Sequence, residues 1–360
     1  MMLMNRKNNG SCTHYGLSEY IVSDLYELDG NSSENKMKEN APIFSIIVTA
    51  YNVADYLGEC LDSVVRQTIE HYKYELIIID DGSTDHSSRI IDSYGIRYND
   101  VMVIHQKNQG LSGARNVGLK CAKGEYILFL DGDDYLHPDT LNMLIQFINI
   151  YQPEIIATYR NYVVELDKSI YVEPNIKNKS EAILKTESGL DYLNQSMKLN
   201  VYQACAQYYV YQKNFLEKEE AKFENGIFHE DELWTLQLLP QAKRVAVNET
   251  PFYYHRMREG SITHQKKFDK NARDLLHICQ EMDQLFPRTI NYVWIRDHIA
   301  TLYMNATYLG GVSTLKGVQV DRKFPLMNAY TTKNRIKAII YFISPCIYIK
   351  LDTFIKNKIG

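Results

Sequence analysis

The sequence of 360 residues lacks several features that would place it in a broad class of protein. Its six cysteines form no CxxC pair, so neither a zinc site nor a disulfide framework is indicated, and a reducing cytoplasm is the simplest setting. A formal net charge of -4 argues against a nucleic-acid-binding protein, whose surface would be basic. The first residues contain an apolar run of only four residues, too short for a signal peptide, and we expect no export.

The segments that are present follow a clear order. With 45% hydrophobic residues, the chain can build one large or two modest cores. Residues 1–40 are polar without steady periodicity, and we expect a poorly ordered tail with one weak helix. Residues 41–263 alternate between strand and helix patterns, and residues 264–335 turn helical. We therefore predict an α/β fold, with a Rossmann-like, mostly parallel sheet flanked by helices and a mainly helical C-terminal region.

Four apolar runs should form the first strands of that sheet. They are FSIIV, ELIII, VMVIH and YILFL, at residues 44–48, 75–79, 101–105 and 126–130. Apolar residues at helical spacing separate these runs, as in LSGARNVGLKCA. The carboxyl ends of such strands meet at one edge of an open sheet, where ligands bind. Polar residues that follow the strands are therefore candidates for a site.

The fourth strand ends in the acidic stretch DGDD. Asp131, Asp133 and Asp134 are like charges that repel one another unless a cation or hydrogen-bond donors share them. Magnesium or manganese binds carboxylate oxygen and keeps positions open for phosphate. We therefore predict Mn²⁺ or Mg²⁺, with Asp133 as direct ligand, Asp131 nearer a ribose and Asp134 supporting. An acidic turn that stays solvated is the alternative.

Polar residues also follow the first two strands. TAYN, from Thr49 to Asn52, would let a ligand approach backbone amides, although a turn with an asparagine cap explains the same letters. In DDGSTD, Asp80 and Asp81 could accept hydrogen bonds from a nucleobase or ribose, and Asp85 could cap the next helix. A turn with its cap is the alternative there too. Because both strand ends face one crevice, the two stretches together favour a nucleotide site.

Glycines in NQGLSGARN open a helix whose early turns carry Arg115. Helix N-termini attract phosphate, and arginine binds phosphate through a planar fork of donors. No GKS or GKT follows, so the stretch is not a Walker loop. Its place between two strand ends that face the ligand predicts a phosphate contact.

Two later stretches add titratable groups. In HEDE, Asp231 is a candidate general base, whereas Glu230 and its neighbour Glu232 could equally be acids favoured at a helix N-terminus. In YYHRMR, His255 is a candidate metal ligand or a structural histidine, and Arg256 or Arg258 could contact a diphosphate.

The last stretch, residues 336–360, is basic and amphipathic. Its apolar core is broken by Pro345 and is too short to cross about 30 Å of hydrocarbon as a helix. Basic residues around an apolar face fit a helix that lies in an anionic membrane surface. A terminal helix that packs on the domain is the alternative.

These motifs in this order resemble family 2 glycosyltransferases with the GT-A fold, especially bacterial enzymes that assemble capsule, exopolysaccharide or lipopolysaccharide. FSIIVTAYN, ELIIIDDGSTD, NQGLSGARN, FLDGDD, HEDE and the YYHR to GSIT segment carry the resemblance over about sixty per cent of the chain. The roles that it implies are donor-nucleotide binding for Thr49, Tyr51, Asn52, Asp80 and Asp81, ribose and metal binding for Asp131 and Asp133, and general base for Asp231.

The resemblance also implies an activity. The chain lacks the QxxRW motif and the membrane spans of the processive synthases, so we expect a single-addition, inverting transferase. The expected donor is a UDP-sugar, and the acceptor a glycan, polyprenyl-diphosphate-linked if the tail binds membrane. The competing hypotheses are a nucleotidyltransferase that makes a nucleotide sugar, and a non-catalytic nucleotide- or carbohydrate-binding module.

Overall fold

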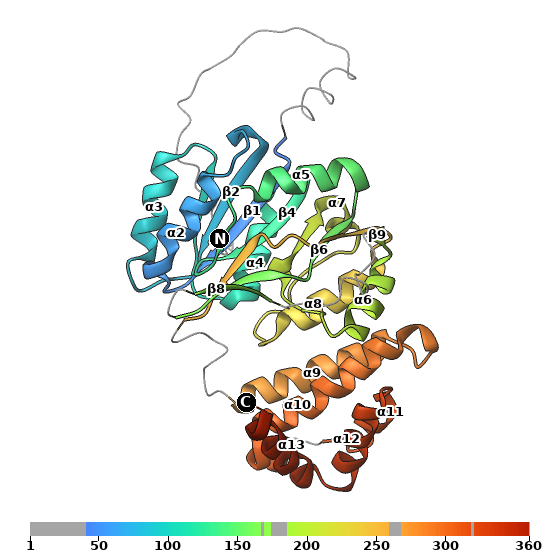
Figure 1. Ribbon diagram of the computed structural model, residues 1–360. Helices are drawn as coiled ribbons and strands as arrows, with labels where there is room; N and C mark the ends of the chain where they lie inside the picture. The colour runs from blue at the N-terminus through green and yellow to red at the C-terminus, as the bar shows by residue number, and fades with distance from the viewer. Residues whose placement is uncertain (1–40, 167–168, 174–185, 259–267, 318–319, 360) are drawn as a thin grey trace, which may run out of the picture.

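The computed structural model describes residues 41–166, 169–173, 186–258, 268–317 and 320–359 (Figure 1). The expected N-terminal tail lies outside these ranges. The structure has a sheet-containing part, up to residue 258, and a helical part that lies below it in Figure 1. The α/β class predicted from the alternating pattern is confirmed.

Among the described residues, the central sheet has eight strands in the order β3-β2-β1-β4-β10-β6-β11-β9. The first four strands are parallel, and they match the four apolar runs within two residues at each end. All seven residues of β1 are buried, as expected for a strand covered on both faces. The strands are β1 (Phe44–Ala50), β2 (Tyr74–Asp80), β3 (Val101–His105), β4 (Tyr126–Asp131), β6 (Ile155–Thr158), β9 (Thr186–Glu187), β10 (Tyr209–Gln212) and β11 (Val245–Asn248).

Helices follow the strands in the expected alternation. In the parallel half, α4 packs against β1 and β2, while α2 lies beside α3. The helices of the sheet-containing part are α2 (Ala54–Val65), α3 (Ser87–Arg97), α4 (Gly110–Cys121), α5 (Thr140–Tyr151), α6 (Gly189–Lys198), α7 (Lys213–Lys218) and α8 (Glu230–Leu238).

A second sheet of four strands brings the YYHR segment to the acidic loop. Its order is β5-β12-β7-β8, where β12 runs antiparallel to β5 and parallel to β7. Tyr254 pairs with Tyr135, the residue that directly follows DGDD. The strands are β5 (Tyr135–Leu136), β7 (Asn161–Val164), β8 (Ile170–Glu173) and β12 (Tyr253–Arg256).

Within residues 268–317 and 320–359, the helical part contains two long α-helices and three further ones. The long helices contact each other, and they also reach the sheet-containing part, since α9 contacts α8 and α10 contacts α6. None of the helices within the described ranges is long and apolar enough to cross a membrane. The five are α9 (Phe268–Leu285), α10 (Val293–Gly317), α11 (Phe324–Asn328), α12 (Thr332–Ile343) and α13 (Pro345–Ile359).

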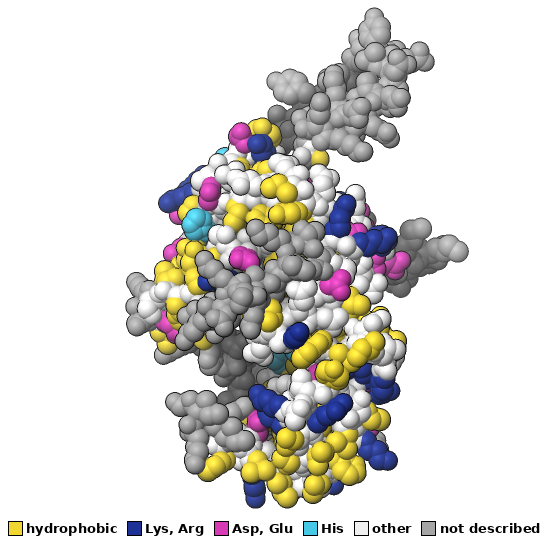
Figure 2. Space-filling model, turned by 45° about the vertical axis from the view of Figure 1, so that its right-hand side comes forward, with side chains coloured by type: hydrophobic (Ala, Val, Ile, Leu, Met, Phe, Trp, Pro, Cys, Tyr) yellow, Lys and Arg dark blue, Asp and Glu magenta, His cyan; other side chains and the backbone are white. Residues whose placement is uncertain are grey.

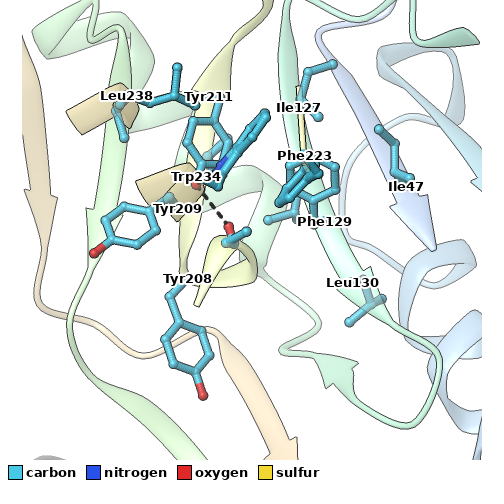
Figure 3. Packing of buried hydrophobic residues seen from close by; sticks show 14 of the residues in the cluster. Ile47, Ile127, Phe129, Leu130, Tyr208, Tyr209, Tyr211, Phe223, Trp234 and Leu238 are labelled. Carbon is cyan, nitrogen blue, oxygen red and sulfur yellow. Dashed lines mark hydrogen bonds between the residues drawn. The ribbon is translucent and has the colours of Figure 1, made fainter. Parts of the chain in front are cut away.

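An aromatic cluster anchors α8 on the central sheet (Figure 3). The ring of Trp234 on α8 stacks on Phe223 with 3.8 Å between centroids, and Phe129 of β4 meets both rings edge-on. The Trp234 indole N–H donates a hydrogen bond of 3.0 Å to the hydroxyl of Tyr211. This buried cluster fixes where the first turn of α8, with HEDE, stands against the tip of β4.

Candidate functional site

The carboxyl ends of β1, β2 and β4 form the edge at which the predicted site residues gather. In the parallel register, Ala50 of β1 lies opposite Asp80 of β2, and Thr49 lies opposite Asp131 of β4. The hydroxyl of Thr49 is 3.5 Å from the Asp131 carboxylate. Tyr51, directly after β1, is 48% exposed, so its ring is open to a ligand.

Asn52 joins the loop after β1 to the loop after β2. Its backbone has a positive φ of 53°, which asparagine tolerates better than most residues. Its side-chain oxygen accepts a hydrogen bond of 2.8 Å from the backbone N–H of Thr84, and its own N–H donates to the Ser83 hydroxyl. Asp85, the expected cap of the next helix, comes just before the N-cap residue His86, and its carboxylate accepts from the N–H groups of Ala54 and Ser87, the first residues of α2 and α3. These hydrogen bonds join the loops after β1 and β2 into one continuous side of the site.

Asp80 is buried and its carboxylate is held inside the protein. It accepts hydrogen bonds from the Ser83 N–H at 2.9 Å and the Ser88 hydroxyl at 2.6 Å, and it lies 2.8 Å from the His105 ring. Burial opposes ionisation of Asp80, but these hydrogen bonds outweigh it and lower its pKa below the ordinary value.

Asp81 is also buried, and it closes the N-terminus of α4. Its oxygens accept from the N–H groups of Gln109 at 2.8 Å and Gly110 at 2.9 Å. The Gln106 side chain donates a third bond of 2.7 Å. The helix N-terminus that the sequence offered to a phosphate is therefore bound to a carboxylate of the protein itself.

The DGDD stretch forms a tight turn at the tip of β4. The N–H of Asp134 donates to the carbonyl of Asp131, and the N–H of Gly132 donates to the carbonyl of Thr49, both at 2.9 Å. A Cβ at Gly132 would stand 2.9 Å from that carbonyl oxygen and 3.1 Å from a methyl of Val53. Only glycine fits this approach of β4 to β1 without a shift.

Asp134 is buried at the back of the turn. Its carboxylate accepts from the Tyr253 hydroxyl at 2.7 Å and the Arg256 N–H at 2.8 Å, and it lies 3.3 Å from Nδ1 of His255. Burial raises the pKa of Asp134 to about 6, although the bond with His255 acts in the opposite direction. The same bond raises the pKa of His255. Asp134 therefore orients β12, including the imidazole.

Asp133 faces the front of the turn and meets the second arginine of YYHRMR. Its carboxylate lies 2.5 Å from Nε of Arg258, and both side chains are about one fifth exposed. Arg256 points elsewhere, because it pairs with Glu59 at 2.8 Å and its guanidinium lies 5.0 Å from the ring centre of Tyr56. Of the two arginines, Arg258 is the one at the acidic cluster.

Arg115 stands at the centre of a buried ion cluster. One guanidinium nitrogen donates to Asp231 at 2.6 Å and Glu230 at 3.1 Å, and the other donates to Asp131 at 3.1 Å. The side chain is only 1% exposed, and its charged end lies over the ring of Phe223 at 5.2 Å. Arg115 therefore ties the strand edge to the first turn of α8 and faces carboxylates rather than open space.

Burial and the neighbouring charges shift the pKa values of Arg115 and Asp231. Burial lowers the pKa of Arg115, but the three carboxylates outweigh it and raise the pKa above the ordinary value, so the guanidinium stays charged. Burial raises the pKa of Asp231, and the charges of Glu230 and Asp131 add to this against the attraction of Arg115. A carboxylate with a raised pKa is a better proton acceptor than an exposed one, which suits a general base.

Two carboxylates at the turn could supply oxygen ligands to a divalent ion, with the remaining positions left to a substrate. The described residues contain no group of three or more His, Cys, Asp or Glu side chains that could hold a metal. Magnesium commonly needs only one or two carboxylates when phosphates supply further oxygens. Asp131 and Asp133 are each 21% exposed at the same turn. With Nδ1 facing Asp134, His255 has the carboxylate support typical of histidines that bind a metal through Nε2.

Tyr253 is a site residue that the sequence reasoning missed. Its buried hydroxyl donates to Asp134 and accepts from the N–H of Asp131 at 3.3 Å, so it braces both ends of the turn. The signal was the two-residue period of a strand, which places Tyr253 and His255 on the same face. The tyrosines Tyr208, Tyr209 and Tyr211 are buried as well, and Figure 3 shows them among the residues of the hydrophobic core.

Comparison with known proteins finds glycosyltransferases by family model and by sequence similarity. A family model described as glycosyl transferase family 2 matches residues 45–204. The chain is 33% identical over 223 residues to the uncharacterized glycosyltransferase EpsJ of Bacillus subtilis, covering 62% of this chain and 63% of that protein. It therefore spans less than two thirds of EpsJ. It is 30% identical over 242 residues to the glycosyltransferase GlyG of Streptococcus pneumoniae, covering 66% of this chain and 78% of that protein.

Among solved structures, Staphylococcus aureus TarS 1–349 has a similar fold. In its complex with UDP-GlcNAc, TarS superposes with a TM-score of 0.58 at 23% identity and covers 88% of this chain and 92% of its own. The likeness includes the helical part as well as the sheet and confirms the predicted GT-A fold. On the identity and coverage shared with GlyG and on the matched family model, this chain belongs to glycosyltransferase family 2.

Proposed function

We propose that this protein transfers a single sugar from a nucleotide-sugar donor to a hydroxyl of a glycan acceptor in cell-surface polysaccharide synthesis. Family membership supports the reaction class, and the complex of TarS with UDP-GlcNAc supports a UDP-sugar as the donor. The transferase domain would be residues 41–263, and the natural acceptor a polyprenyl-diphosphate-linked glycan at the cytoplasmic face of the membrane.

One observation carries the mechanism. Arg115 binds Asp131 at the strand edge and Asp231 on α8 with the same guanidinium. The candidate base is thereby fixed beside the residues expected to hold the donor, and an acceptor hydroxyl that reaches Asp231 also reaches the donor. Preorganised geometry of this kind lowers the barrier to transfer, because the reacting groups need no further ordering.

The donor would lie along the three strand ends. Tyr51 offers an exposed ring against the base, and the side of the site built by Asn52, Asp80 and Asp81 would shape the nucleoside pocket. Asp131 and Asp133 would hold Mn²⁺ or Mg²⁺, with His255 as a further ligand. When bound, the metal would neutralise charge on the diphosphate. Arg258, next to Asp133, would add a second positive charge there.

The residues of this chain then perform one displacement with inversion. Asp231 accepts the proton of the acceptor hydroxyl as its oxygen forms a bond to the anomeric carbon. The bond from that carbon to the diphosphate oxygen breaks, and the diphosphate leaves with the electron pair. Asp134, Tyr253 and Glu230 touch the residues that act rather than the reacting atoms, and they hold the turn and the base in place.

Product analysis tests the proposal. The protein is incubated with a UDP-sugar, manganese and a membrane extract as acceptor source, and the released phosphates are separated by chromatography. The proposal predicts UDP, made by wild type and by an Asp100→Asn control at the opposite edge of the sheet, but not by Asp231→Asn. Pyrophosphate as the product would indicate a nucleotidyltransferase, and donor binding with no product at all would indicate a binding module.

A further inference from the structure

Within the part of the chain that the structure describes, the last two helices expose an apolar surface that the sheet-containing part does not cover. Five large side chains, each between 43% and 65% exposed, recur at spacings of three and four residues along the two helices, so each helix carries one stripe. Figure 2 shows hydrophobic side chains gathered at this end of the molecule with Lys and Arg among them. The surface, called here the α12–α13 surface, consists of Ile336, Ile339 and Ile343 on α12 and Ile347 and Leu351 on α13.

The stripes belong to a fixed helix pair. Behind them, Ala338, Tyr341 and Tyr348 are buried, and the two tyrosine rings meet edge-on with 5.6 Å between centroids. Lys337 on α12 pairs with the buried Asp352 on α13 at 2.8 Å. Both helices also contact α10. The inner faces of the pair thus supply its packing, and the stripes lie on the exposed side of the pair.

The charge around the stripes identifies the kind of partner. Residues 320–359 contain eight lysines and arginines against two aspartates, although the whole chain is negative. Of those two aspartates, Asp352 is buried against Lys337. Lys333, Arg335 and Lys350 are exposed and lie within three or four residues of stripe residues. A second copy packed face to face would bring these like charges together, whereas an anionic surface would attract them.

We propose that the α12–α13 surface binds the surface of an anionic lipid bilayer. The apolar stripes would enter the boundary between headgroups and acyl chains, and the basic residues would face the negative headgroups. The sequence offered the stretch from residue 336 as a membrane-binding tail. The structure instead gives a two-helix surface that begins with α12 at Thr332 and is part of the folded protein.

Such binding would bring the acceptor side of the site to the membrane. The helical part reaches α8 directly, because His298 of α10 pairs with Glu232 at 3.0 Å, one residue from the candidate base. A protein held by its last helices would thus present α8 to acceptors that are anchored in the same bilayer. This consequence rests on the proposed function, whereas the binding itself does not.

Vesicle flotation of the full chain tests the binding. We expect the protein to float with phosphatidylglycerol-containing vesicles and to stay behind with pure phosphatidylcholine. Ile339→Asp combined with Ile347→Asp should abolish flotation. Ile96→Asp combined with Ile150→Asp, at exposed isoleucines on α3 and α5, is the matched control and should float normally. Circular dichroism and thermal unfolding would verify that both double variants fold.

The basic residues provide a second, graded test. Lys333→Gln, Arg335→Gln and Lys350→Gln should each weaken partitioning by about fivefold, with Lys120→Gln on α4 as the neutral control. Absence of flotation with anionic vesicles, or flotation of the Asp double variant like wild type, would overturn the proposal. The proposal would also be overturned if the wild type were a dimer that binds no vesicles and the Asp double variant were a monomer. The surface would then join two copies of the chain. None of these measurements requires sugar transfer, so their failure leaves the proposed function standing.

Discussion

Removal of Arg115 should destabilise the protein because it leaves three carboxylates without their shared cation. Arg115→Met keeps much of the side-chain volume beside Phe223 but removes the ion pairs to Asp131, Glu230 and Asp231. Loss of one partner of a buried ion pair typically costs about 3–5 kcal/mol. We expect a loss of unfolding free energy of this size at pH 8, measured by urea unfolding.

The loss should depend on pH in a defined direction. Burial raises the folded-state pKa of Asp231 above its unfolded value, and without Arg115 the guanidinium no longer opposes that shift. Folding then favours the protonated form of Asp231, so the penalty is present above its folded-state pKa and disappears as pH falls toward the unfolded value. The difference between wild type and Arg115→Met should therefore shrink from pH 8 to pH 5. Adding Asp231→Asn to Arg115→Met should recover about 0.5–3 kcal/mol, because one uncompensated charge is gone.

Two results would refute this reasoning. One is a loss below about 1 kcal/mol at pH 8, which lies within the range of exposed ion pairs. The other is an equal loss at both pH values. Kinetics of Arg115→Lys separate positioning from donor binding. A positioning arginine predicts a lower kcat with little change in the donor KM, whereas a diphosphate contact predicts a raised KM.

Other residues give shorter predictions. Asp231→Asn should bind UDP like wild type but lower kcat by about 10²–10⁴-fold, with Asp100→Asn as the unaffected control. Because burial raises the pKa of Asp231, kcat of the wild type should fall on acidification at a higher pH than an exposed carboxyl would give; a profile flat down to pH 4 would contradict this. Gly132→Ala should cost about 1–3 kcal/mol in urea unfolding and weaken UDP binding, because its Cβ meets a backbone oxygen. Trp234→Ala should cost about 3–5 kcal/mol, and a loss near zero would mean that the aromatic cluster does not anchor α8.

The sequence alone was sufficient to predict the strands and the residues that gather at their carboxyl ends. The apolar composition of runs such as 44–48 and 126–130 predicts buried strands. In a parallel sheet the carboxyl ends of these strands lie at one edge, which places Thr49 and Asp131 side by side. The DGDD stretch could be placed at that edge because it follows its strand directly. These are local sequence patterns, and the rule that ligands bind at the carboxyl ends of parallel strands is enough to predict a site from them.

Contacts between distant segments could not be predicted in the same way. Arg115 was placed at a phosphate-binding helix start, yet it pairs with Glu230 and Asp231 more than a hundred residues later. This pairing depends on the position of α8, which the stacking of Trp234 on Phe223 fixes. The hydrophobic periodicity of the sequence does not predict that stacking. The helix N-terminus itself is closed by Asp81 through tertiary hydrogen bonds that the turn letters do not reveal.

Calorimetric titration with UDP tests the central claim, that the edge of β1, β2 and β4 is a metal-assisted nucleotide-sugar site. The titration is done with and without manganese on wild type, Asp133→Ala and the distant control Asp100→Ala. The account predicts UDP binding that manganese strengthens in wild type and in Asp100→Ala, and binding by Asp133→Ala that is at least about tenfold weaker, or 1.4 kcal/mol, and no longer depends on manganese. Equal manganese-dependent binding by Asp133→Ala, or no binding of UDP, GDP, dTDP or CMP by wild type, would contradict it.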